Sequence, residues 1–283
     1  MKTNKILAAV DLGPDTERIT AYALWLARMT GAEEVRLIHV LDYGLTPPAY
    51  VMPYLEKEKT RLEGEIEKWS GKLRNAGVRA EGRIEVGRLV ETFHGVINSL
   101  RADTIILGYK SHLMRASSSE RLIRSLPIPL LVVRGKKAAD VTFGSARAET
   151  ILCAMDFSDH SLKALEMAKK ICGPSGAELV IVHAVRPLHT GLEVSEGIRE
   201  RYREDRWREA QDKVASLIGD ESAVRILLRE GAPFEVIASV AEEIDASMLF
   251  MGARGLSYLK GVLLGSVSDT LIKSAPCPVM IVH

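Results

Sequence analysis

An internal repeat constrains this chain more than any other feature of its sequence. Three apolar segments of the first half return in the second half in the same order, at an offset of 144 to 149 residues: 6–11 as 151–156, 35–40 as 179–184, and 126–133 as 275–282. Self-similarity at a fixed period is typical of a duplicated structural unit. The 283-residue chain is therefore expected to fold as two related domains, 1–137 and 149–283, joined by a linker at 138–148.

Within each copy, short apolar runs alternate with stretches of helical periodicity. In the first copy Leu62, Ile66, Trp69 and Leu73 recur at spacings that place them on one helix face. The apolar runs are continuous, which is typical of parallel strands covered on both faces. The expected strands are 5–10, 35–40, 79–85, 104–108 and 130–134, then 150–155, 178–184, 223–229, 247–252 and 278–282. With right-handed crossovers, each copy is predicted to be an α/β domain with a doubly wound, Rossmann-like, five-stranded parallel sheet.

Composition excludes several classes of partner and compartment. Lys and Arg number 38 and Asp and Glu number 37, so the net charge gives no reason to expect nucleic acid or an anionic membrane as a partner. No apolar stretch reaches the ~18 residues of a membrane span, and no signal peptide is recognisable at the N-terminus. Cys153, Cys172 and Cys277 lack metal-site spacing and are interpreted as buried thiols in a reducing compartment. These features predict a cytoplasmic protein.

A glycine motif follows the fourth strand of the second copy. It reads Gly252-x2-Gly255-x9-Gly265-Ser266, and in a doubly wound sheet ligands bind beyond the carboxyl ends of the strands. Gly252 is expected to allow a sharp turn off the strand, and Gly255 a positive φ in the returning loop. Gly265-Ser266 is expected to open a helix whose residues 266–269 have the form of a capping box. A glycine loop before a helix N-terminus predicts an anion-binding cradle.

This motif, together with an Asp after the first strand and a His-apolar pair ending the second, resembles the nucleotide signature of ATP-binding universal stress proteins. The resemblance extends over nearly the whole chain, twice. It implies a bound adenine nucleotide, ATP or AMP, with or without Mg²⁺. The residues it implies in binding are Asp156, Ala184, Gly252, Gly255, Gly265, Ser266 and Val267. At the position of Ala184 the family usually has Val, as Val40 in the first copy, so less side-chain contact with a base is expected there.

The first copy departs from this pattern. Its motif begins at Gly108 but lacks the second glycine, the loop is five residues shorter, and Ala116-Ser117 replaces Gly265-Ser266. Residues 117–120 keep the capping-box form, so the helix start is expected to survive while the loop before it is degraded. The corresponding, weaker site residues are Asp11, Val40, Gly108 and Ser117. The basic side chains Lys110, His112 and Arg115 leave a different anion site in this loop open as an alternative.

The same residues also allow simpler structural roles. His39 and His183 end apolar strands, where a packed, hydrogen-bonded histidine is the expected role. Asp11 and Asp156 could cap the following helices instead of contacting a ligand. No P-loop or dinucleotide-binding motif occurs, and no nucleophile–base pair or metal cluster is recognisable. The sequence therefore favours a nucleotide-binding, stress-response regulatory protein; a slow ATP-hydrolysing enzyme and a ligand-free assembly scaffold remain as alternatives.

The fifth strands are expected to join the two domains. Each follows a Pro-x-Pro segment, at 127–129 and 276–278, which suits the edge of a sheet because proline cannot donate a ladder hydrogen bond. Unpaired edges promote aggregation. Pairing of 130–134 with 278–282 would make the chain an intramolecular pseudo-dimer, with further homo-oligomerisation left open.

Overall fold

The computed structural model describes residues 3–44, 46–109, 117–188, 195–218, 224–255 and 263–283. The strands of the first half are β1 (Lys5–Ala9), β2 (Glu34–Asp42), β3 (Ala80–Gly87), β4 (Thr104–Gly108) and β5 (Leu130–Val133). The strands of the second half are β6 (Thr150–Ala154), β7 (Glu178–Val185), β8 (Val224–Glu230), β9 (Met248–Gly252) and β10 (Val279–Val282). The helices are α1 (Thr16–Thr30), α2 (Pro48–Asn75), α3 (Leu89–Leu100), α4 (Ser118–Ile123), α5 (Lys136–Ala139), α6 (Asp159–Ser175), α7 (Glu196–Ile218), α8 (Pro233–Glu243) and α9 (Ser266–Ser274).

Each half is a doubly wound parallel sheet, as the sequence predicts. In the first half β1 pairs with both β2 and β4, and in the second half β6 pairs with both β7 and β9. The chain therefore reverses its direction of winding beside β1 and again beside β6. The space beyond the carboxyl ends of these strands is where ligands bind in open α/β sheets.

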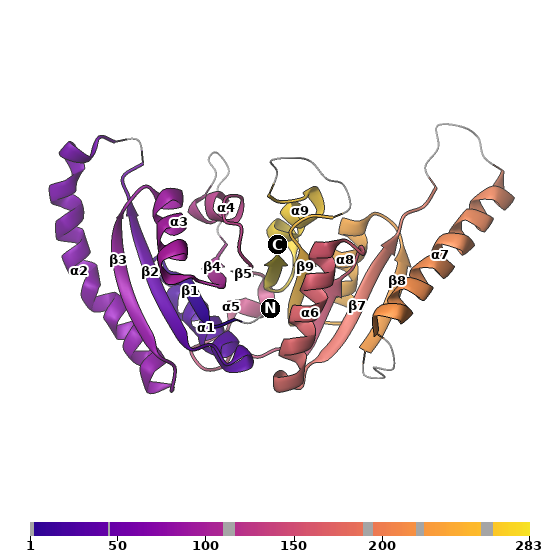
Figure 1. The fold of residues 1–283 in the computed structure, drawn as a ribbon, viewed down its shortest axis with the longest axis horizontal. Coiled ribbons are helices and arrows are strands. Elements are labelled where there is room, and N and C mark those ends of the chain that lie inside the picture. The colour runs from indigo at the N-terminus through magenta and orange to yellow at the C-terminus, as the bar shows by residue number, and fades with distance from the viewer. Residues whose placement is uncertain (1–2, 45, 110–116, 189–194, 219–223, 256–262) are drawn as a thin grey trace.

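The two sheets are joined edge to edge. The ten strands form one sheet in the order β3-β2-β1-β4-β5-β10-β9-β6-β7-β8 (Figure 1). The central pair is antiparallel, with Met280 opposite Leu131, and every other strand pair within the described residues is parallel. The predicted contact between the fifth strands is confirmed. It pairs two edges that would otherwise be open to other chains.

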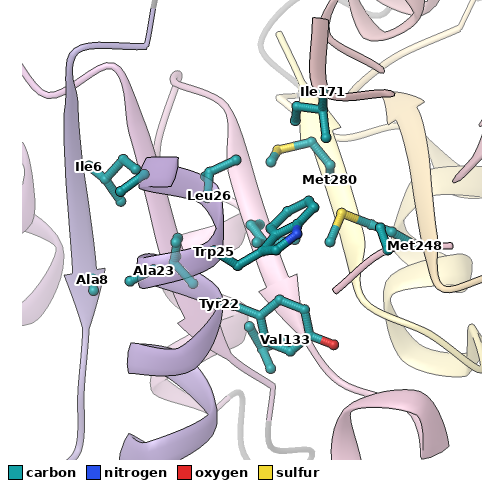
Figure 2. Packing of buried hydrophobic residues seen from close by; sticks show 14 of the residues in the cluster. Ile6, Ala8, Tyr22, Ala23, Trp25, Leu26, Val133, Ile171, Met248 and Met280 are labelled. Atoms are coloured by element: carbon teal, nitrogen blue, oxygen red, sulfur yellow. The ribbon is translucent and has the colours of Figure 1, made fainter. Parts of the chain in front are cut away.

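An apolar core also joins the halves on one face of the sheet. Trp25 of α1 is only 6% exposed and points toward Met248 and Met280 of the second half (Figure 2). Tyr22 lies edge-on to Trp25, with ring centroids 6.4 Å apart. The connecting segment contributes as well, because Ala138 is fully buried in the same core. Separating the halves would expose this shared surface, so tests of binding are best made on the full chain.

Two of the three cysteines are buried, as the sequence predicts, and the third is only partly buried. All three cysteines carry free thiols; Cys153 and Cys277 are buried and Cys172 is partly buried. Burial raises the pKa of the Cys153 and Cys277 thiols to about 12 and that of Cys172 to about 11, so all three are protonated at neutral pH.

None of the described helices is both long and apolar enough to cross a bilayer.

Candidate functional site

A cleft of about 560 Å³ opens at the carboxyl ends of β6, β7 and β9. Its walls come from these strands, from α7 and from the start of α9. Its volume is within the ~300–1,000 Å³ range of small-molecule sites. The structure brings together all seven residues that the sequence singled out in the second half, and all of them line the cleft: Asp156, Ala184, Gly252, Gly255, Gly265, Ser266 and Val267.

The N-terminus of α9 faces this cleft without a side-chain cap. Gly265 is the N-cap residue, and as a glycine it has no side chain with which to cap the helix. The predicted capping box at 266–269 is wrong, because the helix begins one residue earlier than that motif requires. Asp269 consequently lies too far along the helix to reach back, and the Ser268 hydroxyl instead donates to the Gly252 carbonyl at 2.9 Å. The first N–H groups of a helix have no acceptor within the helix, so those of α9 remain available to a ligand in the cleft.

Gly252 and Gly255 are needed for close packing, and neither has the positive φ that favours glycine. The expectation of a positive φ at Gly255 is wrong, since neither Gly255 nor Gly252 is among the described glycines with positive φ. A Cβ on Gly255 would overlap the Asp156 carboxylate, and a Cβ on Gly252 would lie 2.8 Å from the amide nitrogen of Ser161. Two segments distant in sequence thus approach each other at the base of the cleft through positions that only glycine fits.

Asp156 is held by its own loop. Its Oδ1 accepts hydrogen bonds from the Ser158 amide at 3.1 Å and the Ser158 hydroxyl at 2.6 Å. Phe157, between Asp156 and Ser158, has a left-handed backbone with φ 64°. This conformation is uncommon for a non-glycine residue. Ser158 is the N-cap of α6 and accepts from the Ser161 amide at 3.3 Å. The alternative that Asp156 caps this helix is therefore wrong; its carboxylate lines the cleft, with Oδ2 toward Gly255.

The two strand-end histidines have the packed role expected from sequence. The Nδ1 atom of His183 is 2.8 Å from the Met155 carbonyl, and that of His39 is 2.8 Å from the Val10 carbonyl. The Phe157 ring lies against His183, with centroids 4.8 Å apart. Burial lowers the pKa of His183, so it is neutral at pH 7.

A wall of α7 completes the cleft, and the sequence analysis missed it. The side chains of Tyr202, Arg206, Glu209 and Lys213 recur at spacings of four, three and four residues and line the cleft. Glu209 pairs with both Arg206 and Lys213 at 2.6 Å. Their spacing could have identified them, because this polar stripe runs beside the buried positions Ala210 and Val214.

The cleft has an excess of positive charge. The described residues that line it include four cationic side chains and two carboxylates: Arg186, Arg206, Lys213 and Arg254, with Asp156 and Glu209. The Lys213 ammonium also lies 5.5 Å from the centroid of the Phe157 ring. A pocket with this balance attracts an anionic ligand.

The matching helix start in the first half is closed by its own side chains. The Ser117 hydroxyl accepts from the Glu120 amide at 3.2 Å, and the Glu120 carboxylate accepts from the Ser117 amide at 2.9 Å. This confirms the capping box predicted for 117–120. The Tyr109 hydroxyl also donates to Glu120 at 3.0 Å. A carboxylate therefore already occupies the N-terminus of α4, where an anionic ligand would need free N–H groups.

An ion pair at the end of β2 is a second difference between the first half and the second. Arg121 of α4 binds Asp42 at the end of β2 at 2.8 Å, and Asp42 also accepts from the amides of Gly44 and Leu89 at 2.9 and 3.3 Å. Burial alone would raise the pKa of Asp42, but these hydrogen bonds hold it below its ordinary value. The first-half candidates Asp11, Val40, Gly108 and Ser117 lie at this same edge of the sheet. The basic residues Lys110, His112 and Arg115 lie outside the described residues.

Two partly buried histidines, His183 and His283, predict a pH dependence of stability. Burial, with His160, Arg254 and Lys163 nearby, lowers the pKa of His283 to about 4, and burial also lowers the pKa of His183. Unfolded histidine has a pKa of about 6.5. Between pH ~6.5 and about 4 the unfolded chain therefore binds protons that the folded chain does not, and the free energy of unfolding falls as pH falls.

Urea unfolding from pH 7.5 to 4.5 would measure this fall, and the substitution His283→Gln is expected to make it shallower. An unfolding free energy that is identical for both proteins at every pH would show that His283 is protonated equally in the folded and unfolded chains.

Known proteins resemble the chain over both halves. A family model described as "Universal stress protein family" matches residues 2–134 and 148–283. A Thermus aquaticus relative, "Universal stress protein in QAH/OAS sulfhydrylase 3'region", is 35% identical over 138 residues, which cover 48% of this chain and 98% of the relative. Universal stress protein YxiE of Bacillus subtilis is 31% identical over 144 residues, or 47% of this chain and 97% of the relative.

A solved structure shares the tandem architecture. The crystal structure of a universal stress protein from Archaeoglobus fulgidus superposes with a TM-score of 0.76. The superposition covers 100% of this chain and 99% of that one, at 24% sequence identity. The likeness of fold thus extends over both halves.

Proposed function

Because the chain belongs to the universal stress protein family, we propose that it is a regulatory protein of the stress response that binds one adenine nucleotide, in the cleft of its second half. The supporting observation is the contrast between two equivalent helices of one molecule. The N-terminus of α9 is uncapped and faces the cleft, whereas Ser117 and Glu120 cap α4. A hydrogen bond to a charged group contributes about 1.5–3 kcal/mol, so free N–H groups at a helix start favour a phosphate.

The lining residues indicate how a nucleotide would lie. Its phosphates would approach Gly265, Ser266 and Val267, where the helix dipole and backbone N–H groups favour negative charge. Its ribose and base would lie toward Asp156 and Ala184. Among the described residues, no group of three His, Cys, Asp or Glu side chains converges on a metal site. Mg²⁺ would therefore arrive with ATP, coordinated mainly by phosphate oxygens and water.

Binding is favoured over hydrolysis as the activity of this cleft. Nδ1 of His183 lies against the Met155 carbonyl, and Oδ1 of Asp156 accepts two hydrogen bonds from Ser158. These contacts give both groups a structural role. A slow ATPase remains the runner-up, and a ligand-free scaffold remains a third candidate. Phosphate release at saturating ATP would support the ATPase, and the absence of any nucleotide binding would support the scaffold.

Binding is tested by calorimetric titration of the full-length, nucleotide-free chain with ATP and AMP. We expect one nucleotide per chain, since α4 is already capped. The substitution Asp156→Asn is expected to weaken binding by about tenfold, because the cleft then has no charged acceptor at this position. Asp11→Asn, the matched control, is expected to leave the affinity unchanged. Two sites per chain, or equal effects of the two substitutions, would contradict the assignment of the site to the second half.

A further inference from the structure

Two arginines of the first half hold α9, the helix whose N-terminus lines the cleft. The first is Arg134, which directly follows β5. Its Nη1 donates to the carbonyl of Ile272 at 2.5 Å and lies 3.5 Å from that of Leu271. Its guanidinium also lies 5.5 Å from the centroid of the Tyr109 ring. A side chain from one half thus binds a carbonyl near the C-terminus of a helix in the other.

This interaction bears on the whole helix. The last carbonyls of a helix lack the usual partner within it; that of Leu271 accepts from the Ala275 amide at 2.8 Å, and that of Ile272 accepts from Arg134. The side chains of Leu271 and Ile272 are buried. A cation at this end also interacts favourably with the helix dipole. Because α9 has nine residues, it is only about 13 Å long. A shift at its C-terminus therefore displaces the N–H groups that face the cleft.

The second arginine acts near the other end of α9. Arg124, just after α4, binds Asp269 at 2.6 Å, and Lys273 binds the other oxygen of the same carboxylate at 2.7 Å. Asp269 lies in the first turn of α9. At the matching place in α4, Glu120 turns back and caps its own helix. The pairs with Arg124 and Lys273 compensate the charge of Asp269 at the side of α9.

We propose that the first half, through Arg134 and Arg124, positions α9 and thereby sets the affinity of the second-half cleft for the phosphates of a nucleotide. This inference rests on the proposed function and adds a regulatory role for the first half. A perturbation at the β5–β10 junction then reaches the cleft through α9. Arg134 and Arg124 are positioning residues, because they act through the helix and not on the ligand.

The test compares ATP with adenosine, which lacks phosphates, on the full-length chain. Arg134→Met is expected to weaken ATP binding by about tenfold and to leave adenosine binding unchanged. Arg134→Lys, which keeps the charge, is expected to restore part of the ATP affinity. The matched control is Arg28→Met, because Arg28 donates to the Ala76 carbonyl at the end of α2, wholly within the first half, at 3.2 Å. It is expected to change neither affinity.

Substitutions of Arg124 test the inference independently of Arg134. Arg124→Ala is expected to weaken ATP binding by about threefold, as for an exposed ion pair. Adding Asp269→Asn to that variant is expected to restore the ATP affinity, because the carboxylate that Lys273 alone then compensates is removed from the first turn of α9.

The outcomes separate the inference from the function on which it rests. If the unmodified chain binds no nucleotide, the proposed function fails. The inference fails if the unmodified chain binds ATP but Arg134→Met weakens the binding of ATP and adenosine equally. It also fails if Arg134→Met weakens the binding of neither, because Arg134 then has no role in positioning. Where Arg134→Met does not fold, as judged by thermal melting, Arg134→Lys decides: ATP affinity equal to that of the unmodified chain would overturn the inference.

Discussion

Replacing Gly265 with valine is expected to weaken ATP binding roughly ten- to a few-hundred-fold for each backbone N–H that can no longer reach a phosphate, while the nucleotide-free protein melts as before. The expected effect corresponds to about 1.5–3 kcal/mol for a hydrogen bond to a charged group, at about 1.4 kcal/mol per decade of affinity. Gly265 lines the cleft immediately before the first turn of α9. A β-branched side chain there would occupy the space through which a phosphate must approach the backbone.

The fold should tolerate this substitution. Gly265 has φ −76° and ψ 161°, an extended conformation that valine adopts readily. A Cβ at this position would come no closer than 3.5 Å to a neighbouring atom, the Ala253 carbonyl oxygen, which is an ordinary van der Waals distance. The expected loss of ATP affinity therefore comes from the valine side chain blocking the phosphate, and not from strain in the backbone.

Thermal melting without ligand and titration with ATP, on the same preparation, measure the two effects separately. A variant that melts normally yet binds ATP as tightly as the unmodified chain would show that phosphates do not bind at α9. A variant that melts much lower would show that the open geometry around Gly265 is not that of the folded protein.

The sequence predicts the architecture well because the relevant signals are local and occur twice. Continuous apolar runs such as 104–108 and 248–252 identify strands buried on both faces. The Pro-x-Pro segments predict the edge strands that pair in the centre of the sheet. The second-half site residues could be predicted for a related reason: the carboxyl ends of parallel strands meet at one edge, so motifs after different strands converge on one cleft.

The features that the sequence does not predict depend on interactions between distant residues. Both 117–120 and 266–269 have the form of a capping box, but only the first is one, because α9 begins one residue earlier. That shift accompanies the pairing of Asp269 with Arg124, 145 residues away in the sequence. The Arg121–Asp42 pair of the first half is likewise separated by 79 residues. No local pattern predicts such pairs, because they arise from the packing of complete domains.

The glycines that end β9 and β4 give the second large expected effect, on stability. Gly252→Ala is expected to lower the free energy of unfolding by about 1–3 kcal/mol, the usual range for overpacking a well-packed site. The added Cβ would lie 2.8 Å from the Ser161 amide nitrogen and 2.8 Å from the Cβ of His160. These atoms belong to the first turn of α6, so the helix itself would have to move.

The first copy provides a matched control at the equivalent position. A Cβ on Gly108 would meet the Cδ1 atom of Ile19 at 3.3 Å. That atom is the end of a flexible side chain, which can move by a few tenths of an ångström. Gly108→Ala is therefore expected to change the free energy of unfolding by less than about 1 kcal/mol.

Urea unfolding of the two variants and the unmodified chain, without nucleotide, decides the comparison. Equal decreases would contradict a cause in the approach of α6 to β9, because the two positions differ in what the added Cβ meets. A clear decrease for Gly252→Ala alone would show that this glycine is required by packing, independently of any ligand.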